Sequence, residues 1–145
     1  MKSILFSYII FLFTVSGEWL TDFELAKQEA RDNHKMIVLN FSGSDWCGPC
    51  IQMKRSVFEQ SAFQDYASKN LILVRADFPR HKKNQLEPKV QAHNEKLADQ
   101  YNPKGKFPLT LLLNAEGKVI YEWDGYSGAS AEEFVKQLDA RVNGK

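Results

Sequence analysis

The pentapeptide Trp46-Cys47-Gly48-Pro49-Cys50 follows the apolar run Met36-Ile37-Val38-Leu39-Asn40-Phe41 and holds both cysteines of the 145-residue chain. The apolar run predicts a strand that is buried on both faces of a sheet. Two thiols separated by two residues can close into a small disulfide and reopen, which makes them a two-electron switch. We therefore interpret the rest of the chain as a scaffold for this pair.

The composition is that of an ordinary globular protein, with 43% apolar and 26% charged residues. A formal net charge of +1 gives no whole-chain field that would favour nucleic acid or a membrane surface. The length fits one domain, and two cysteines are too few for a disulfide framework.

The N-terminus has the pattern of a secretory signal peptide. Lys2 precedes an apolar block over 4–13, and small residues up to Gly17 suit cleavage there. The block is too short for a comfortable membrane span. We expect residues 1–17 to be a signal peptide and residues 18–145 to form the folded domain, with a buried N-terminal strand or an uncleaved anchor as alternatives. Export would place the protein in the periplasm or outside the cell, in an oxidising compartment.

Hydrophobic periodicity predicts alternating strands and helices. Strands are expected over 36–41, 71–77, 109–113 and 119–123, the last two as a hairpin, and helices over about 21–33, 49–60, 61–66, 88–101 and 130–142. Two parallel strands joined by a helical crossover, followed by an antiparallel hairpin, predict a single mixed sheet flanked by helices.

Helix starts are predicted from capping boxes, in which a Ser or Thr precedes Glu or Gln by three residues. The chain offers three such pairs: Thr21 with Glu24, Ser61 with Gln64, and Ser130 with Glu133. Leu20 and Leu25 are placed as a hydrophobic staple around the first box, and Trp19 is expected on the buried face of that helix.

The context of strand, tight loop and helix assigns roles to the two cysteines. Cys47 is expected at the helix N-terminus, where free N–H groups and the helix dipole favour a thiolate. It would attack a substrate disulfide, and Cys50, one turn further and more buried, would attack Cys47 to release the reduced substrate. Gly48 leaves room for an approaching chain, and Pro49 tolerates a position where an N–H is not wanted.

Two alternatives compete with this role. A zinc site needs about four ligands, and His34, His81 and His93 lack the spacing to join the pair. We therefore expect no metal and no cofactor. The pair could also be an inert structural disulfide, but a ring closed over three residues staples almost nothing.

At this point the chain resembles the thioredoxin superfamily over nearly all of residues 19–143. The redox pentapeptide matches thioredoxin's own, and Phe107-Pro108 stands just before Leu109-Thr110-Leu111, where the family has a cis proline facing the cysteines. The resemblance implies a thioredoxin-like α/β fold. It also implies that Pro108 shapes a substrate groove, that the backbone of Phe107 pairs with an extended substrate segment, and that Trp46 lies as a lid beside Cys47.

The chain departs from the family pattern in three ways. Thioredoxin has a buried aspartate in the central strand, where this chain has Asn40, and the distance from there to Cys47 is one residue longer. Residues 80–87 look like an insertion, which makes small exported relatives the better comparison. We hypothesise that resolution by Cys50 is slow here, or uses Asp45 or water as the base.

The sequence therefore favours an exported thiol–disulfide oxidoreductase that acts on protein disulfides. We expect a monomer that has a redox partner such as a membrane electron relay and binds no nucleic acid. An oxidase or isomerase of the same fold and a non-catalytic peptide-binding module remain alternatives, whereas the close cysteine pair disfavours a peroxide-reducing enzyme. The basic stretch Arg80-His81-Lys82-Lys83 is either a solvated face or a docking element for an acidic partner.

Overall fold

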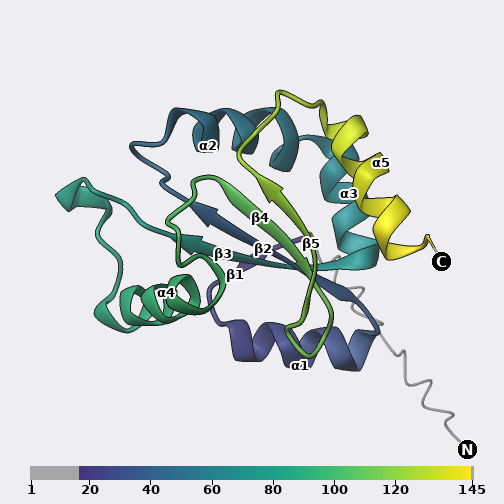
Figure 1. Ribbon diagram of the computed structural model, residues 1–145, viewed down its shortest axis with the longest axis horizontal. Coiled ribbons are helices and arrows are strands. Elements are labelled where there is room, and N and C mark those ends of the chain that lie inside the picture. Colours follow the sequence, from purple (N-terminus) through teal and green to yellow (C-terminus); the bar gives the residue numbers. More distant parts are fainter. Residues whose placement is uncertain (1–16, 145) are drawn as a thin grey trace, which may run out of the picture.

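The computed structural model describes residues 17–144, so the predicted signal peptide lies outside the described residues apart from Gly17. A five-stranded sheet with the order β1-β3-β2-β4-β5 crosses the molecule (Figure 1). Its strands are β1 (Trp19–Leu20), β2 (Met36–Ser42), β3 (Leu71–Asp77), β4 (Leu109–Leu113) and β5 (Val119–Asp124). β2 pairs in parallel with β3 and antiparallel with β4, which forms a hairpin with β5. The predicted mixed sheet is confirmed.

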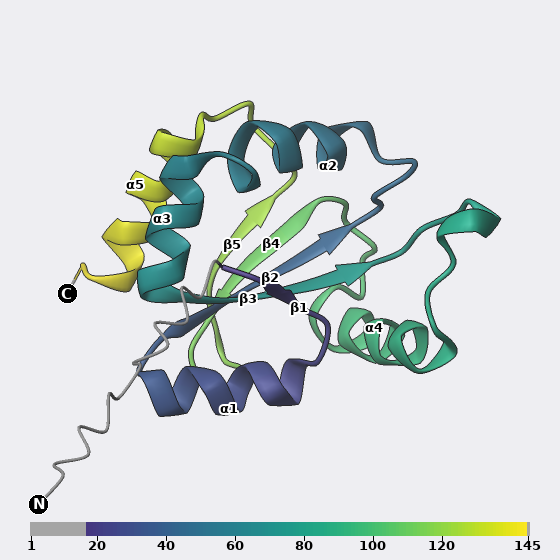
Figure 2. The same cartoon turned by 180° about the vertical axis from the view of Figure 1, so that it is seen from behind.

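Helices cover both faces of this sheet, as Figures 1 and 2 show from opposite sides. They are α1 (Phe23–Asn33), α2 (Gly48–Met53) with a π-helical continuation (Lys54–Phe58), α3 (Ser61–Asn70), α4 (Pro88–Tyr101) and α5 (Ala131–Val142). α1 and α4 share one hydrophobic core with the sheet, and α2, α3 and α5 share the other. A short 3₁₀ turn (Lys82–Asn84) lies between β3 and α4.

The central strand β2 is buried on both faces, as its predominantly apolar sequence predicts. Ile37, Leu39 and Phe41 belong to the core under α1 and α4, whereas Val38 belongs to the core under α2, α3 and α5. All four side chains are fully buried, and each contributes roughly 1.5–3 kcal/mol relative to an exposed position. This strand therefore holds the loop that follows it, which carries the cysteines, on a rigid base.

The predicted N-cap of the first helix is wrong by one residue. Asp22, not Thr21, is the N-cap, and its carboxylate accepts a hydrogen bond from Leu25 N at 3.0 Å. The predicted staple also fails, because the side chain of Leu25 is exposed. A carboxylate at the positive end of the helix dipole is a strong cap, which explains why Asp22 caps the helix in place of Thr21.

Trp19 lies in β1 and not on a helix. β1 adds to the edge of the sheet in parallel with β3, and the Trp19 ring stacks on Phe63 and meets the edge of Phe58. The guanidinium of Arg75 covers the same indole ring at 4.1 Å. These long-range contacts, and not local spacing, place Trp19.

The other two predicted capping boxes have opposite outcomes. Ser130 and Glu133 form both hydrogen bonds of a capping box at the start of α5, which confirms that prediction. Ser61 is instead the first residue of α3, and the N-cap Gln60 makes no side-chain capping bond. The helix predicted over 49–60 is also corrected: it ends at Phe58, and its last five residues have π-helical hydrogen bonding.

Candidate active site

The two cysteines lie at the start of α2 and form a disulfide, with their Cα atoms 5.2 Å apart. Cys47 is the N-cap in extended conformation, and its sulfur accepts a hydrogen bond from Cys50 N at 3.3 Å. A tight turn precedes it, because the N–H groups of Trp46 and Cys47 both bond to the carbonyl of Gly43. Pro49 occupies the first turn of the helix, where a missing N–H costs nothing. The Cys47 sulfur therefore faces the positive end of the helix dipole, as predicted.

Cys50 is the more buried cysteine, as expected, but the difference between the two is small. Cys47 is 5% exposed and Cys50 is 3% exposed in this disulfide-bonded state. Gly48 and Pro49 are exposed, and a Cβ added at Gly48 would meet nothing within 4 Å. The solvent-exposed side of the cysteine pair is therefore the surface formed by Gly48 and Pro49.

The Phe107–Pro108 peptide bond is cis, which confirms the expectation from the resemblance. The Phe107 ring lies edge-on to Trp46 at 5.4 Å and to Phe78 at 5.6 Å. The Pro108 carbonyl accepts a hydrogen bond from Gly125 N, whereas neither backbone group of Phe107 has a partner within residues 17–144. Unpaired backbone groups next to the cysteine-bearing region are what an extended segment would need for strand-like pairing.

Trp46 is half-buried and held on several sides. Its indole Nε1 donates to the Phe78 carbonyl at 2.7 Å, and the Arg80 guanidinium lies 3.7 Å from the ring centroid. Gly43 is a site residue that the sequence reasoning missed: a Cβ there would lie under 3.0 Å from atoms of the Trp46 ring. The tight turn requires glycine at this position because a larger residue would overlap the indole ring. This requirement comes from a contact with a residue three positions further along the chain, so the glycine alone does not indicate it.

Asp45 joins the loop before Cys47 to residues 80–84 through hydrogen bonds. Its Oδ1 accepts from Arg80 N at 2.9 Å, and its Oδ2 accepts from His81 N at 3.0 Å and from Asn84 Nδ2 at 2.9 Å. Desolvation opposes ionisation, but these hydrogen bonds outweigh it and lower the pKa of Asp45 to about 2. A carboxylate with so low a proton affinity is a poor general base, so the hypothesis that Asp45 deprotonates Cys50 loses support.

Asn40 occupies the buried position behind the cysteine-bearing helix. Its Nδ2 donates to Thr110 Oγ1 at 3.0 Å, and that oxygen contacts Met53 Sδ of α2 at 3.9 Å. Asn40 is 2% exposed and Thr110 is fully buried. This chain of contacts holds no carboxylate and offers no proton acceptor of useful basicity at neutral pH.

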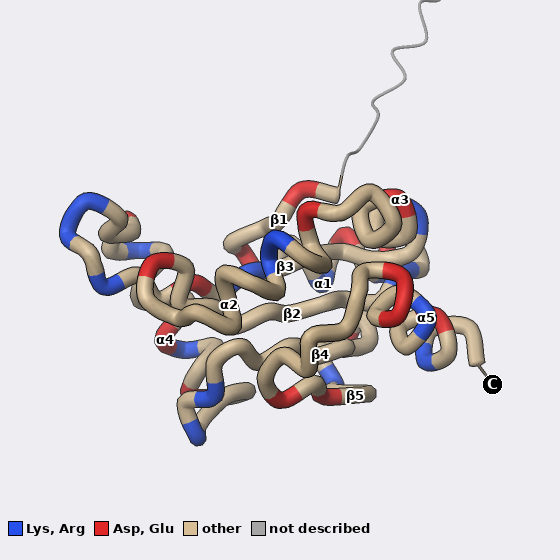
Figure 3. Tube along the Cα trace, turned by 90° about the horizontal axis from the view of Figure 1, so that it is seen from above, with Lys and Arg blue, Asp and Glu red and all other residues tan. Residues whose placement is uncertain are grey.

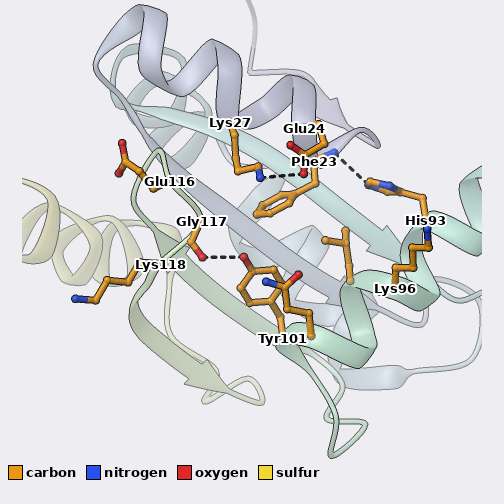
Figure 4. Close-up of a pocket in the computed structure, with 11 residues that line it drawn as sticks. Phe23, Glu24, Lys27, His93, Lys96, Tyr101, Glu116, Gly117 and Lys118 are labelled. Carbon is orange, nitrogen blue, oxygen red and sulfur yellow. Dashed lines mark hydrogen bonds and ion pairs between the residues drawn. The ribbon is translucent and has the colours of Figure 1, made fainter.

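A cavity of about 530 Å³ lies elsewhere, on the face of the sheet that α1 and α4 cover (Figure 4). His93 Nε2 accepts a hydrogen bond from Phe23 N across it, and Tyr101 donates to the carbonyl of Gly117. Lys27 is paired with Glu24 at its rim. Neither cysteine lines it.

No group of three or more His, Cys, Asp or Glu side chains within residues 17–144 is arranged to hold a metal ion. Over the same residues, no helix combines the length and apolarity that crossing a membrane requires.

A cysteine pair at the start of a helix, a cis proline before the adjoining strand and a mixed sheet with helices on both faces together define the thioredoxin fold class. A family model described as a thioredoxin-like domain matches residues 23–141, and the chain belongs to this family. It is similar to the disulfide bond reductase DsbH of Chlamydia pneumoniae, with 38% identity over 117 residues that cover 81% of this chain and 68% of DsbH.

Two other comparisons agree. The thioredoxin-related protein DsbJ of Chlamydia pneumoniae is 27% identical over 120 residues, which cover 83% of this chain but only 34% of DsbJ. A solved structure described as DsbH oxidoreductase superposes with a TM-score of 0.79 and 26% identity, over 99% of this chain and 96% of that one. The predicted thioredoxin-like fold is confirmed, and the chain is a protein-disulfide oxidoreductase.

Proposed function

We propose that this protein reduces disulfide bonds of polypeptides outside the cytosol, through a dithiol–disulfide cycle of Cys47 and Cys50. The observation that carries the proposal is the position of the Cys47 sulfur at the N-terminus of α2, bonded to Cys50. Positive potential there stabilises a thiolate, which is the attacking species. The similarity to a relative named disulfide bond reductase favours the reducing direction.

The cycle starts from the reduced pair. The Cys47 thiolate attacks one sulfur of the substrate disulfide, so that the substrate S–S bond breaks and a mixed disulfide forms. The departing substrate thiolate takes up a proton. Cys50 then loses its proton and attacks the Cys47 sulfur, which releases the second substrate thiol and closes the Cys47–Cys50 disulfide. Two electrons pass from the pair to the substrate, and a dithiol donor, such as a membrane electron relay, must return them.

The groove around the pair would be formed by Trp46, Gly48, Pro49, Phe107 and Pro108. The unpaired N–H and C=O groups of Phe107 would hydrogen-bond an extended substrate segment as in strand addition. The exposed surface at Gly48 and Pro49 would let that segment reach the Cys47 sulfur.

We infer that water takes the proton of Cys50. Asn40 cannot accept a proton at neutral pH, and both oxygens of Asp45 are bonded to residues 80–84. Resolution of the mixed disulfide should then be slow relative to attack by Cys47.

Turnover of insulin disulfides with a small dithiol as donor tests the activity. The wild-type protein should catalyse the reduction, Cys47→Ser should abolish it, and Cys50→Ser should accumulate a mixed disulfide visible by mass spectrometry. Binding of a peptide without any turnover would contradict the proposal and support a non-catalytic peptide-binding module.

A redox titration of the pair against glutathione tests the direction. A reductase should have a midpoint near the value of about −270 mV that is typical of thioredoxin. A midpoint near about −120 mV, as in DsbA, would instead support an oxidase.

The location is tested through residues 1–17. Expression of the full chain in a bacterium with an export pathway should yield a periplasmic or secreted protein that begins at Glu18, and mass measurement of the intact product reads this directly. A product that keeps residues 1–17 would contradict cleavage.

A further inference from the structure

The segment between β3 and α4 is hydrogen-bonded to residues 42–46, which directly precede Cys47. We call residues 80–84 the basic loop. Besides the three bonds to Asp45 described above, Phe78 N donates to the Ser42 carbonyl and Trp46 Nε1 donates to the Phe78 carbonyl. Asp77 accepts two hydrogen bonds from Ser44. The position of the basic loop beside the cysteines is therefore built into the same residues that precede Cys47.

The basic loop carries positive charge that the protein does not neutralise. Figure 3 shows its Lys and Arg positions at the tip of a projection, at the end of the molecule where α2 begins. Arg80, Lys82 and Lys83 are exposed, and within residues 17–144 none of them forms an ion pair with a carboxylate. Asp45 is the adjacent acid, but its oxygens are already bonded to the loop itself.

The surface around Lys106, on the side of β5, carries more negative than positive charge. Lys106 is paired with Glu122 and with Asp124, each at 2.8 Å, so one lysine meets two carboxylates. The cis proline follows directly after Lys106 and Phe107. A chain bound along Phe107 would therefore have unpaired cations on the side of the basic loop and a slightly negative surface on the side of β5.

We propose that the basic loop selects substrates, so that the protein prefers disulfides flanked by Asp or Glu over those flanked by Lys or Arg. The inference rests on the proposed function, since it names the substrate class of the same site. Arg80 is the nearest element of this recognition: its planar face lies on Trp46, the neighbour of Cys47, and its N–H groups remain available to a carboxylate. Lys82 and Lys83 add a field that favours encounter with an acidic segment.

The test uses two disulfide-linked peptides of equal length, with Glu in one and Lys in the other at two positions next to the cysteine. Stopped flow measures the second-order rate constant for reaction with the reduced protein. Each value is divided by the rate constant with dithiothreitol, which removes differences in intrinsic reactivity. The wild-type protein should prefer the Glu peptide about five- to tenfold at low salt. The preference should shrink towards unity at about 0.5 M salt, where screening is strong.

Variants separate recognition from folding. Lys82→Glu with Lys83→Glu leaves the Arg80–Trp46 contact in place and should reduce or invert the preference. A matched control, Lys69→Glu with Lys136→Glu, reverses two exposed positive charges on α3 and α5, changes the net charge by the same amount and should leave the preference unchanged.

The outcomes distinguish the two proposals. Equal rates for both peptides, or a preference that charge reversal at Lys82 and Lys83 does not alter, would overturn the selection of acidic substrates while leaving the reductase intact. Failure of the wild-type protein to reduce either peptide would overturn the proposed function, and the inference with it.

Discussion

Asn40 donates a hydrogen bond to Thr110 Oγ1 at 3.0 Å, and through Thr110 it is connected to Met53 of the helix that carries both cysteines. The contact joins β2, β4 and α2 beneath the redox pair. It satisfies two buried polar side chains without bringing a charge into the core. Because the side chain at position 40 is an amide, it accepts no proton at neutral pH.

Replacing Asn40 by Asp should therefore create a base beneath the pair. Burial raises the pKa of a carboxyl group, so the new side chain should ionise above its usual range and then accept the proton of Cys50. We expect the mixed disulfide to decay faster in Asn40→Asp than in the wild-type protein, with a rate that rises as the new carboxyl group loses its proton. Stopped-flow decay of a preformed mixed disulfide between pH 5 and 9 measures this.

The substitution should also make stability depend on pH. A folded-state pKa above the unfolded value means that the folded state binds more protons, so the free energy of unfolding should fall as pH rises between the two values. Asn40→Ala is the matched control, because it removes the amide and adds no carboxylate. An unchanged decay rate and pH profile in Asn40→Asp would count against slow resolution.

The lowered pKa of Asp45 predicts a pH-dependent attachment of the basic loop. Because the folded-state pKa is about 2 and the unfolded value is near 3.9, the contribution of the ionised carboxylate is complete above about pH 4 and is lost as pH falls through about 2. The amide chemical shifts of Arg80 and His81 should titrate with a midpoint near 2 in NMR spectra.

In Asp45→Asn this titration should disappear, and hydrogen exchange at the Arg80 and His81 amides should accelerate at neutral pH. Asp99→Asn is a suitable control, because Asp99 is an exposed acid of α4 on another part of the surface. A wild-type midpoint near 4 would show that the hydrogen bonds from the loop do not stabilise the carboxylate.

Several features that depend on neighbouring residues were predictable from sequence, although two of the three predicted capping boxes were wrong. The predominantly apolar run of β2, the helix start at Cys47 and the capping box at Ser130 each involve interactions within a few residues, and the structure has all three. The hairpin of β4 and β5 belongs to the same group, because its turn requires glycine at 117, where φ is 87°.

Features that depend on distant contacts were not predictable. β1 has only two residues, and it exists because it pairs with β3 and because Trp19 packs against Phe63. The role of Asp45 depends on backbone N–H groups 35 and 36 residues further along the chain. In each case local spacing contains no trace of the partner, so pattern analysis assigns Trp19 to a helix and Asp45 to a possible base.

Ser130 and Ser61 both match the capping-box pattern, but only Ser130 caps a helix, and this difference can be tested. Ser130→Ala should destabilise the protein by about 1 kcal/mol, because the Glu133 N–H loses its side-chain acceptor. Ser61→Ala should change stability by less than about 0.5 kcal/mol, because Ser61 lies inside the first turn of α3 and makes no capping bond there. Urea unfolding of the two variants measures both values, and equal losses would mean that Ser61 also acts as a cap.

Gly43 should be the least tolerant glycine near the cysteines. A methyl group at this position would lie under 3.0 Å from the Trp46 ring, which cannot move away freely because Phe78, Arg80 and Phe107 hold it. Gly43→Ala should cost about 1–3 kcal/mol in urea unfolding, the usual range for overpacking, and should shift the NMR signal of the Trp46 indole N–H. Gly48→Ala is the matched control for stability, since its added methyl group meets nothing within 4 Å and should change stability by about 0.5 kcal/mol or less. If Gly43→Ala were as stable as Gly48→Ala, the ring of Trp46 would have to be mobile, and the proposal that it forms a fixed part of the substrate groove would be wrong.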